Sequence, residues 1–277
     1  MTGESGAYVP SIALNDENTM PVLGLGVAEL SDDETERAVA TALEIGYRLI
    51  DTAAVYGNEA AVGRAIAASG IPRAELFVTT KVANADHGFN TAQDAVKVSL
   101  DKLGLDYVDL YLVHWPGGGA TWAWPGMEAA RARGYARAIG ISNFNVDELD
   151  LLVAEASDAP VVDQVQFNPT AFRRTLLDAC AERGVALEAY SPLGTGAVLG
   201  DPVVAGIADR LGRSPAQVLL RWCVQRGIPV VTKSTHRDRI AENARVFDFE
   251  LSDRDLEDLD AIDRSGRTGE ALERKWW

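Results

Sequence analysis

Three apolar, strand-like stretches of the chain end on an ionisable residue, at Asp51, Lys81 and His114. Tyr56 follows the first of these ends by five residues. Strands that are buried on both faces read as continuous apolar runs, so a charged group at the end of such a run needs a reason. In parallel α/β folds the carboxyl ends of the strands meet on one face, where active sites are built. We therefore expect the four side chains to share one rim, where they would form a proton-transfer site.

The four residue types complement one another chemically. A free tyrosine has a pKa of about 10 and donates its proton poorly at neutral pH. The ammonium group of Lys81 would stabilise the phenolate and is expected to lower the pKa of Tyr56. A carboxylate such as Asp51 holds a buried lysine in its charged form, and His114 can hydrogen-bond a carbonyl oxygen. The set suits reversible protonation at a carbonyl or an alcohol. Because none of its members supplies electrons, a hydride source is required.

Each of these residues also has a structural explanation. Asp51 alone reads most simply as an N-cap or turn residue, His114 as a core histidine, and Tyr56 as an aromatic residue on the rim. Lys81 is harder to explain in this way, because lysine is seldom buried without a partner. A purely structural role, in which the four form a buried ion network, is the weakest alternative. Their joint arrangement favours a functional site, because each residue supplies what another needs.

Apolar strand-like runs and amphipathic helical segments alternate along the chain. Eight such runs with intervening helices and no linker favour a closed (β/α)8 barrel, a TIM barrel, over an open sheet. The half-motif Gly24-Leu25-Gly26 lacks the third glycine and the later acid of a nucleotide-binding open sheet, so we interpret it as a tight strand. The strand-like runs are 22–26, 47–51, 76–81, 107–114, 137–142, 161–166, 185–190 and 228–232, and the helical segments include 33–45, 58–68, 91–102, 145–155, 170–183, 214–226 and 237–245.

The whole chain, 1–277, is interpreted as a single barrel domain, with the barrel itself at 22–245. The segment Asn15-Asp16-Glu17-Asn18 is typical of a hairpin turn. The parts outside the barrel are an N-terminal hairpin at 8–20, an extra capped C-terminal helix at 252–262 and a polar tail at 264–277 that ends in two tryptophans.

Composition and charge limit the classes of function. The 277 residues are 47% apolar and 24% charged, which is enough to bury a large core. A net charge of −15 argues against nucleic acid or an anionic membrane as a partner. We find neither a secretory signal nor a membrane span, so a cytoplasmic protein is expected. Cys180 and Cys223 are expected to be free buried thiols, and no spacing of His or Cys indicates a metal site.

Further polar side chains at strand ends offer a cleft for the hydride source. Ser142 and Asn143 lie at the end of one run, Gln164 lies in the next, and Tyr190 ends a third. Hydroxyl and carboxamide groups recognise a carboxamide, and an aromatic face stacks on a flat ring. The segment Lys233-Ser234-Thr235-His236-Arg237-Asp238-Arg239 gathers cations and hydroxyls at the start of a helix, which suits a phosphate. Taken alone, this segment also fits a solvated helix face.

With these residues in view, the chain resembles the aldo-keto reductase family across about residues 8–262. The spacing of Tyr56, Lys81 and His114 agrees with that family. The resemblance is closest to its bacterial 2,5-diketo-D-gluconate reductase-like branch. Three family signatures carry it: Gly46-Tyr47-Arg48-Leu49-Ile50-Asp51-Thr52-Ala53 with Glu59 and Gly63, Leu105-Asp106-Tyr107-Val108-Asp109-Leu110-Tyr111-Leu112-Val113-His114-Trp115-Pro116, and Lys233-Ser234 with Arg239 and Asn243.

The resemblance implies that NADPH binds in an extended form across the barrel mouth. It makes Tyr56 the general acid, Lys81 and Asp51 its tuning pair, and His114 the group that orients the carbonyl. For the cofactor it implies contacts from Ser142, Asn143 and Gln164 to the carboxamide, from Tyr190 to the nicotinamide face, from Ser191, Leu193 and Gly194 to the pyrophosphate, from Lys233, Ser234 and Arg239 to the 2′-phosphate, and from Glu242 and Asn243 to the adenine.

Several positions depart from the family's pattern, and all of them lie outside the four proton-transfer residues. Ala28 and Ala83 stand where related reductases carry aromatic residues, while Trp115 is retained as a substrate-binding wall. The loss of two bulky side chains is expected to widen the substrate pocket, unless tryptophans elsewhere fold over it. Thr232, before the phosphate-binding lysine, and the stretch Gln166–Pro169 also differ from the commoner versions.

We therefore predict an NADPH-dependent carbonyl reductase that acts on small molecules, with no metal, nucleic-acid or membrane partner. The resemblance suggests aldehydes, α-dicarbonyls and keto-sugars as substrates. It favours a monomer and leaves an oligomer open. The main alternative is an NADP(H)-binding sensor in which turnover is incidental.

Overall fold

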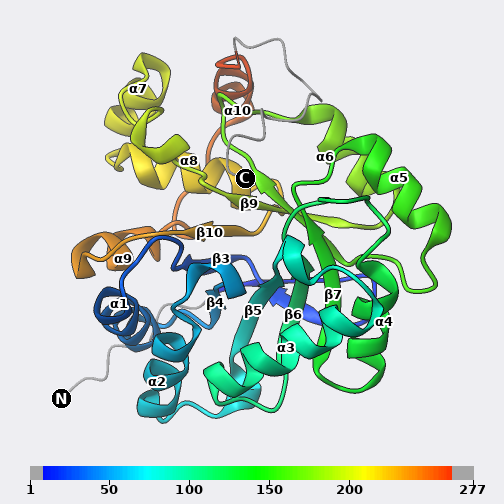
Figure 1. Cartoon of the computed structure of the whole chain (residues 1–277). Helices are drawn as coiled ribbons and strands as arrows, with labels where there is room; N and C mark the ends of the chain where they lie inside the picture. Colours follow the sequence, from blue (N-terminus) through cyan, green and yellow to red (C-terminus); the bar gives the residue numbers. More distant parts are fainter. Residues whose placement is uncertain (1–8, 264–277) are drawn as a thin grey trace.

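In the computed structural model, which describes residues 9–263, eight parallel strands close into a barrel. Around the barrel the strands follow the order β10-β3-β4-β5-β6-β7-β8-β9, so the first and last barrel strands are neighbours. This arrangement, visible in Figure 1, confirms the expected (β/α)8 fold. The strands are β3 (Leu23–Gly26), β4 (Leu49–Asp51), β5 (Phe77–Val82), β6 (Val108–Val113), β7 (Ala136–Ser142), β8 (Val162–Gln166), β9 (Ala186–Tyr190) and β10 (Val230–Thr232).

Side chains alternate between the two faces of each barrel strand. Along β5, Phe77 belongs to the apolar cluster inside the barrel, whereas Val78 packs in the layer between strands and helices. Because side chains two residues apart share a face, Lys81 points to the interior like Phe77. The same alternation directs Gln164 of β8 and Glu188 of β9 inward. The barrel interior therefore holds polar side chains beyond its apolar layers.

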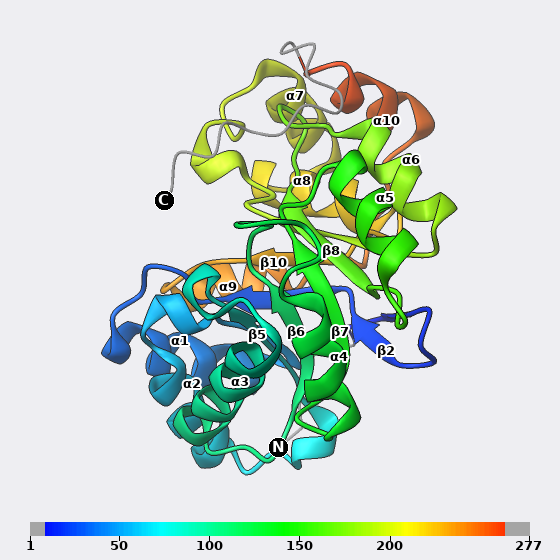
Figure 2. The same ribbon diagram turned by 45° about the vertical axis from the view of Figure 1, so that its right-hand side comes forward.

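Helices cover the outside of the barrel (Figures 1 and 2). Ser31 begins α1 with a capping box that includes Glu34, and Gly104 ends α3 with a φ of 65°. The helices are α1 (Asp32–Ile45), α2 (Glu59–Ser69), α3 (Phe89–Leu103), α4 (Trp124–Ala132), α5 (Val146–Glu155), α6 (Arg174–Glu182), α7 (Pro202–Leu211), α8 (Pro215–Val224), α9 (Arg237–Asn243) and α10 (Asp253–Asp260).

Several observed elements differ from the expected ranges at their ends, and two helices were not among the segments given as examples. Helix α4 was not among the expected segments. The loop before it is rich in glycine and tryptophan, which makes the helical spacing of its apolar residues hard to recognise. Helix α7 was also not among the expected segments that were named, although Asp201 caps it, Pro202 is its first residue and Gly212 ends it. Strand β6 ends at Val113, so His114 lies one residue beyond the strand instead of within it.

The N-terminal hairpin lies against the end of the barrel at which the strands begin. Its two strands, β1 (Ser11–Ala13) and β2 (Thr19–Pro21), pair antiparallel. The expected turn joins them, with the Leu14 amide donating to the Asn18 carbonyl over 2.8 Å. Met20 is fully buried and belongs to the apolar cluster inside the barrel. The hairpin therefore closes this end of the barrel core.

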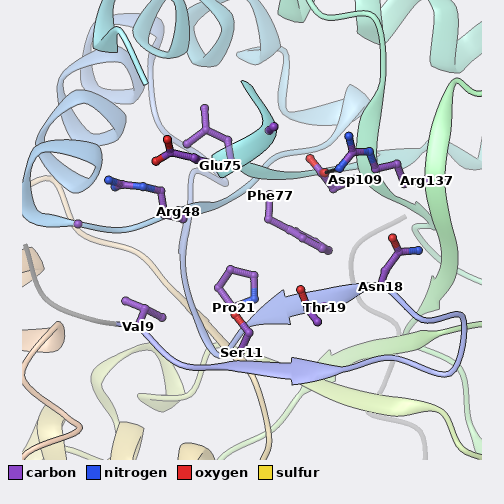
Figure 3. Close-up of a pocket in the computed structure, with 13 residues that line it drawn as sticks. Val9, Ser11, Asn18, Thr19, Pro21, Arg48, Glu75, Phe77, Asp109 and Arg137 are labelled. Carbon is purple, nitrogen blue, oxygen red and sulfur yellow. Dashed lines mark ion pairs between the residues drawn. The ribbon is translucent and has the colours of Figure 1, made fainter. Parts of the chain in front are cut away.

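A pocket of about 550 Å³ lies between the hairpin and the starts of the barrel strands. Its wall includes Phe77, the first residue of β5, and the side chains of Asp109 and Arg137, whose charged atoms are 3.6 Å apart (Figure 3). Arg48 and Glu75 also line it. This pocket is at the opposite end of the barrel from the strand ends that carry the proton-transfer residues, so it is separate from the site they form.

The extra C-terminal helix is present as α10, slightly shorter than the expected 252–262. It is tied to α8 through Trp222, whose indole Nε1 donates to Asp260 over 2.8 Å. The polar tail expected at 264–277 and the expected start of the hairpin at residue 8 lie outside the described residues.

The two cysteines, Cys180 and Cys223, are buried and unpaired, which confirms the expected free thiols. Within residues 9–263 no helix is both long and apolar enough to cross a membrane. The same part of the chain contains no group of three or more His, Cys, Asp or Glu side chains that could hold a metal ion.

Candidate active site

A buried ion pair joins the C-terminal ends of β4 and β5. The ammonium group of Lys81 lies 2.6 Å from Asp51 Oδ1 and donates to the Thr52 carbonyl over 3.0 Å. Burial by itself lowers the pKa of a lysine, but the charges of Asp51 and Tyr56 outweigh it, and the pKa of Lys81 stands above its ordinary value. The lysine is therefore charged at neutral pH, as the sequence predicted.

Tyr56 reaches the same place from the short 3-10 helix η1 (Ala54–Tyr56) that follows β4. Gly57 ends this turn with a φ of 72°, a conformation that glycine adopts without strain. The ammonium nitrogen of Lys81 lies 5.2 Å from the centroid of the Tyr56 ring. The ring of His114 meets the Tyr56 ring edge to face, with centroids 5.6 Å apart. The structure therefore brings all four candidate proton-transfer residues together at one rim.

The pKa of Tyr56 differs from the expectation drawn from the sequence. Burial raises it, Lys81 lowers it through charge and a hydrogen bond, and Asp51 raises it. Lys81 lowers the pKa of Tyr56 as expected, but the net direction is upward, because desolvation of the phenolate outweighs the effect of a single ammonium group. Tyr111, which is also buried but without a cation among the groups that shift it, has a pKa raised well above its ordinary value. Lys81 therefore partly offsets the effect of burial on Tyr56.

His114 is a neutral hydrogen-bonding group at neutral pH. Burial, followed by the charge of Lys81, lowers its pKa to about 3. A neutral imidazole donates through one ring nitrogen and accepts through the other. The main chain of His114 is held on both sides, because its amide donates to the Val82 carbonyl over 3.3 Å and its carbonyl accepts from Asn143 Nδ2 over 3.0 Å. The main chain of His114 is thus anchored to the end of β5 and to the residue that follows β7.

The residues expected at a carboxamide are connected by hydrogen bonds. The Ser142 hydroxyl donates to the main-chain carbonyl of Gln164 over 2.7 Å, and Asn143 Nδ2 donates to Ser142 Oγ over 3.0 Å. The Tyr190 hydroxyl donates to Asn143 Oδ1 over 2.8 Å. Asn143 has a φ of 66°, a conformation that asparagine tolerates better than most residues. These bonds connect the ends of β7, β8 and β9 in one polar band.

Gln164 also faces the buried ion pair, where it meets a residue that the sequence analysis missed. Its Nε2 atom donates to Asp51 Oδ2 over 2.7 Å and to Glu188 Oε2 over 2.8 Å. Glu188 is fully buried in β9. The available signal was a charged residue inside the apolar run 185–190, which is the same kind of disruption that marks Lys81. The interior of the barrel therefore holds one more ionisable side chain than expected.

The cations expected at a 2′-phosphate lie at the surface after β10. Lys233 Nζ is 2.9 Å from a carboxylate oxygen of Glu29, which follows the neighbouring strand β3. Ser234 Oγ accepts from the His236 amide over 3.1 Å, and Arg239 is exposed. Glu29 has a φ of 62° and was indicated by no sequence pattern. Lys233 is thus engaged by a carboxylate at the position where a phosphate is expected.

The other residues expected at the cofactor lie on neighbouring segments. Ser191, Leu193 and Gly194 form a turn after β9, in which the Gly194 amide donates to the Ser191 carbonyl over 2.9 Å. Asn243 is buried at the end of α9, and its side-chain amide donates to a hydroxyl at the end of β10 over 3.5 Å. Glu242 precedes it and is half-buried. Their contacts with a pyrophosphate and an adenine stay predictions.

The expected substrate wall is formed in part by Trp115. Its ring is stacked beside the His114 ring, with centroids 6.5 Å apart and planes inclined by 27°. Ala28 follows β3 and Ala83 follows β5, and both are half-buried and too small to fill the volume of an aromatic ring. Trp122, in the loop after β6, is 57% exposed. The wider pocket stays a prediction.

Comparison of the sequence with known proteins identifies its relatives. A family model described as Aldo/keto reductase family matches residues 22–264. An aldo-keto reductase of Mycobacterium tuberculosis (strain CDC 1551 / Oshkosh) is 54% identical over 274 residues, which cover 98% of this chain and 97% of the relative. An aldo-keto reductase of Mycolicibacterium vanbaalenii is 52% identical over 266 residues, which cover 95% of each chain.

Solved structures of aldo-keto reductases also superpose on this chain. An aldo/keto reductase from Brucella melitensis superposes with a TM-score of 0.91 at 41% identity, covering 94% of this chain and all of that one (100%). The Bombyx mori aldo-keto reductase, solved in complex with NADP, superposes with a TM-score of 0.89 at 38% identity, covering 96% and 95% of the two chains.

The fold and the site define an oxidoreductase that acts on carbonyl groups with a nicotinamide cofactor. More narrowly, the chain belongs to the aldo/keto reductase family, as its signatures predicted. The resemblance to the 2,5-diketo-D-gluconate reductase-like branch stays a prediction.

Proposed function

We propose that this protein reduces small aldehydes, α-dicarbonyls and keto-sugars to alcohols, with NADPH as the hydride donor and Tyr56 as the general acid. The observation that carries the proposal is the position of the Tyr56 ring, 5.2 Å from an ammonium group that is buried and paired with a carboxylate. A tyrosine beside a permanently charged lysine is suited to give and take a proton repeatedly.

The residues present fit a nicotinamide cofactor. Gln164 directs both hydrogens of Nε2 to carboxyl groups of the protein, which leaves Oε1 as an acceptor for the N–H of a carboxamide. The half-buried ring of Tyr190 lies in the same polar band. The relative from Bombyx mori was solved in complex with NADP, which supports the same cofactor here. When bound at this rim, the cofactor supplies the hydride that no side chain provides.

The side chains of the rim would position the carbonyl and deliver the proton. The neutral His114 donates a hydrogen bond to the carbonyl oxygen and orients it. Tyr56 transfers its phenolic proton to the same oxygen as negative charge develops there. Lys81, held charged by Asp51, stabilises the phenolate that remains. In the direction of alcohol oxidation the phenolate takes the proton back.

Preference for NADPH over NADH is the second part of the proposal. Lys233 and Arg239 place two cations after β10 in a chain whose net charge is −15. Charge-assisted hydrogen bonds from such groups stabilise a bound phosphate, and only NADPH carries one on the 2′-oxygen of its adenosine ribose. We therefore expect tighter binding of NADPH.

The Tyr56→Phe variant tests the proton donor, because it removes the hydroxyl and keeps the ring. We expect carbonyl reduction to be abolished while NADPH affinity stays nearly unchanged. A variant that keeps more than about a tenth of wild-type turnover, a cost under ~1.4 kcal/mol, would show that Tyr56 is not the acid. Tyr107→Phe is a matched control, since the Tyr107 ring lies at the other end of the barrel, 4.1 Å from the guanidinium carbons of Arg73 and Arg137.

A panel of aldehydes, α-dicarbonyls and keto-sugars separates the enzyme from a cofactor sensor. An enzyme turns over at least one member of the panel at a rate that Tyr56→Phe removes. A sensor binds NADPH and shows negligible turnover with every member, in the wild type and the variant alike.

A further inference from the structure

A continuous series of hydrogen bonds crosses the barrel interior from Lys81 to Glu188. Lys81 Nζ donates to Asp51 Oδ1 over 2.6 Å, and Asp51 Oδ2 accepts from Gln164 Nε2 over 2.7 Å. The same nitrogen donates to Glu188 Oε2 over 2.8 Å. All four side chains are buried. The Lys81–Asp51 pair beside Tyr56 and Gln164, the residue expected to bind the cofactor carboxamide, therefore belong to one hydrogen-bonded network.

The two carboxyl groups determine which way the Gln164 amide is turned. A carboxamide has one end that donates two hydrogen bonds and one end that accepts. Asp51 and Glu188 present oxygens at 2.7 and 2.8 Å to the same atom, so only the NH2 end fits there. An amide oxygen in that place would face two oxygen atoms. Gln164 and Glu188 are also register partners on neighbouring strands, so this contact follows directly from the pairing of β8 with β9.

Glu188 is a costly residue to bury for packing alone. Its Oε1 atom has no hydrogen-bond partner within residues 9–263. An unpaired polar atom in a barrel core lowers stability, and an apolar side chain would fill the same volume without that cost. Burial, followed by the charge of Asp51, raises the pKa of Glu188 to about 8. Its Oε2 atom accepts the hydrogen bond from Gln164 Nε2.

We propose that Glu188 is a positioning residue that holds the Gln164 amide with Nε2 toward the interior and Oε1 toward the rim, as the acceptor for the cofactor carboxamide. The proposal rests on the proposed function, which assigns Gln164 to that carboxamide. Glu188 acts through Gln164 and touches neither the substrate nor the cofactor. Without Glu188, one N–H of Gln164 is buried unpaired, and only Asp51 still opposes the flipped amide.

Two substitutions at position 188 distinguish the effect of the hydrogen-bond acceptor from the effects of side-chain volume and charge. The E188L variant fills a similar volume without an acceptor, and the E188Q variant keeps an acceptor oxygen and resembles the protonated acid. Each is made alone, and E188L is also combined with Q164A. The readouts are the dissociation constant of NADPH, measured by fluorescence titration, and the midpoint of thermal unfolding. D163N is the control, because Asp163 is a buried acid on the outward face of β8.

We expect E188L to weaken NADPH binding about five- to tenfold, because one hydrogen bond to Gln164 is lost. The unfolding midpoint should change little, because the removal of the unpaired Glu188 Oε1 offsets the Gln164 N–H that is left unpaired, and no cavity is made. E188Q and D163N should bind NADPH within about twofold of the wild type, the scatter of neutral substitutions. In the Q164A background E188L should add less than about twofold, because two residues that act through one contact are not additive.

Three results would overturn the proposal. An E188L protein that binds NADPH like the wild type shows that Gln164 needs no second carboxyl. An E188Q protein that folds but binds NADPH more than about fivefold more weakly shows that the charge of Glu188, not its acceptor, matters. This second test holds even if E188L does not fold. An E188L effect that persists undiminished in Q164A shows that Glu188 acts elsewhere, while the assignment of Gln164 stands. By contrast, wild-type NADPH affinity in Q164A would contradict the proposed function itself.

Discussion

The rim of the barrel carries two lysine–carboxylate pairs that differ in burial far more than in distance. Lys81 and Asp51 approach to 2.6 Å, with side chains that are 1% and 5% exposed. Lys233 and Glu29 approach to 2.9 Å, with side chains that are 43% and 79% exposed. The contact distances alone would make the two pairs equivalent, yet the first lies beside the proposed proton donor and the second at the expected phosphate site.

Burial gives the two pairs opposite properties. We call Lys81–Asp51 the inner pair and Lys233–Glu29 the outer pair. In the interior the attraction acts at a low effective dielectric constant, and neither partner can exchange the other for water, so the inner pair stays in contact. At the surface, water and salt screen the charges, and such a pair contributes only ~0–1 kcal/mol. The inner pair therefore suits a constant charge beside Tyr56. The outer pair suits a position where one anion is replaced by another.

The largest effect is expected from breaking the inner pair. Lys81→Met keeps much of the side-chain length and removes the charge beside Tyr56. We expect turnover to fall about 10²-fold or more, since a positioned general acid contributes about 10²–10⁴-fold. Asp51 is left buried without its cation, which costs ~3–5 kcal/mol of folding stability unless the carboxyl group takes up a proton. Steady-state turnover and thermal unfolding measure the two losses.

The double variant Asp51→Asn/Lys81→Met separates these losses from each other. It removes both charges, so most of the stability lost in Lys81→Met should return, because no buried charge is left unpaired. Turnover should stay low, because the ammonium group is still absent. If turnover returned together with stability, the inner pair would be a structural ion network and not a support for Tyr56.

The two pairs also differ in how far the sequence predicts them. Asp51 and Lys81 each end an apolar run, and the strand ends of a parallel barrel share a rim, so their meeting follows from pattern and fold class. Glu29 stands in a loop and meets a lysine 204 residues away in the chain. Contacts between loops depend on the path of the chain in space, which no local period encodes.

Burial accounts for the other differences between expectation and structure. The residue types indicate that Lys81 lowers the pKa of Tyr56, but they do not say how much solvent the ring loses, and that loss decides the net direction. Glu188 interrupts an apolar run and was visible in the sequence. The role of Glu188 depends on the strand register that places it opposite Gln164, and the pattern of residues along a single strand does not specify that register.

A smaller effect is expected from removing the cation of the outer pair. Lys233→Met should weaken NADPH binding about tenfold, close to the value of one charge-assisted hydrogen bond, and leave NADH within about twofold. Fluorescence titration of both cofactors at one salt concentration measures the difference. Lys97→Met removes a surface cation that pairs with Asp94 on α3, and it controls for the loss of one positive charge. Equal losses for NADPH and NADH would contradict a role at the 2′-phosphate.

The smallest effect, with the opposite sign, is expected from Glu29→Gln. The carboxylate of Glu29 competes with a phosphate for the ammonium group of Lys233, and a neutral amide competes less. We expect NADPH to bind about two- to threefold more tightly and NADH to be unchanged, because an exposed pair is worth only ~0–1 kcal/mol. The gain should shrink as the ionic strength rises from about 0.01 to about 0.15 M, because screening weakens exposed charges.

The control for this change is Glu36→Gln, which removes another exposed carboxylate, one that pairs with Arg64 over 2.8 Å. Both variants change the net charge of −15 by one unit, so a difference between them reports local competition at Lys233. Glu36→Gln should leave both affinities unchanged. Weaker binding of NADPH by Glu29→Gln would mean that Glu29 holds Lys233 in place for the phosphate. The outer pair would then be a positioning device like the inner one, despite its exposure.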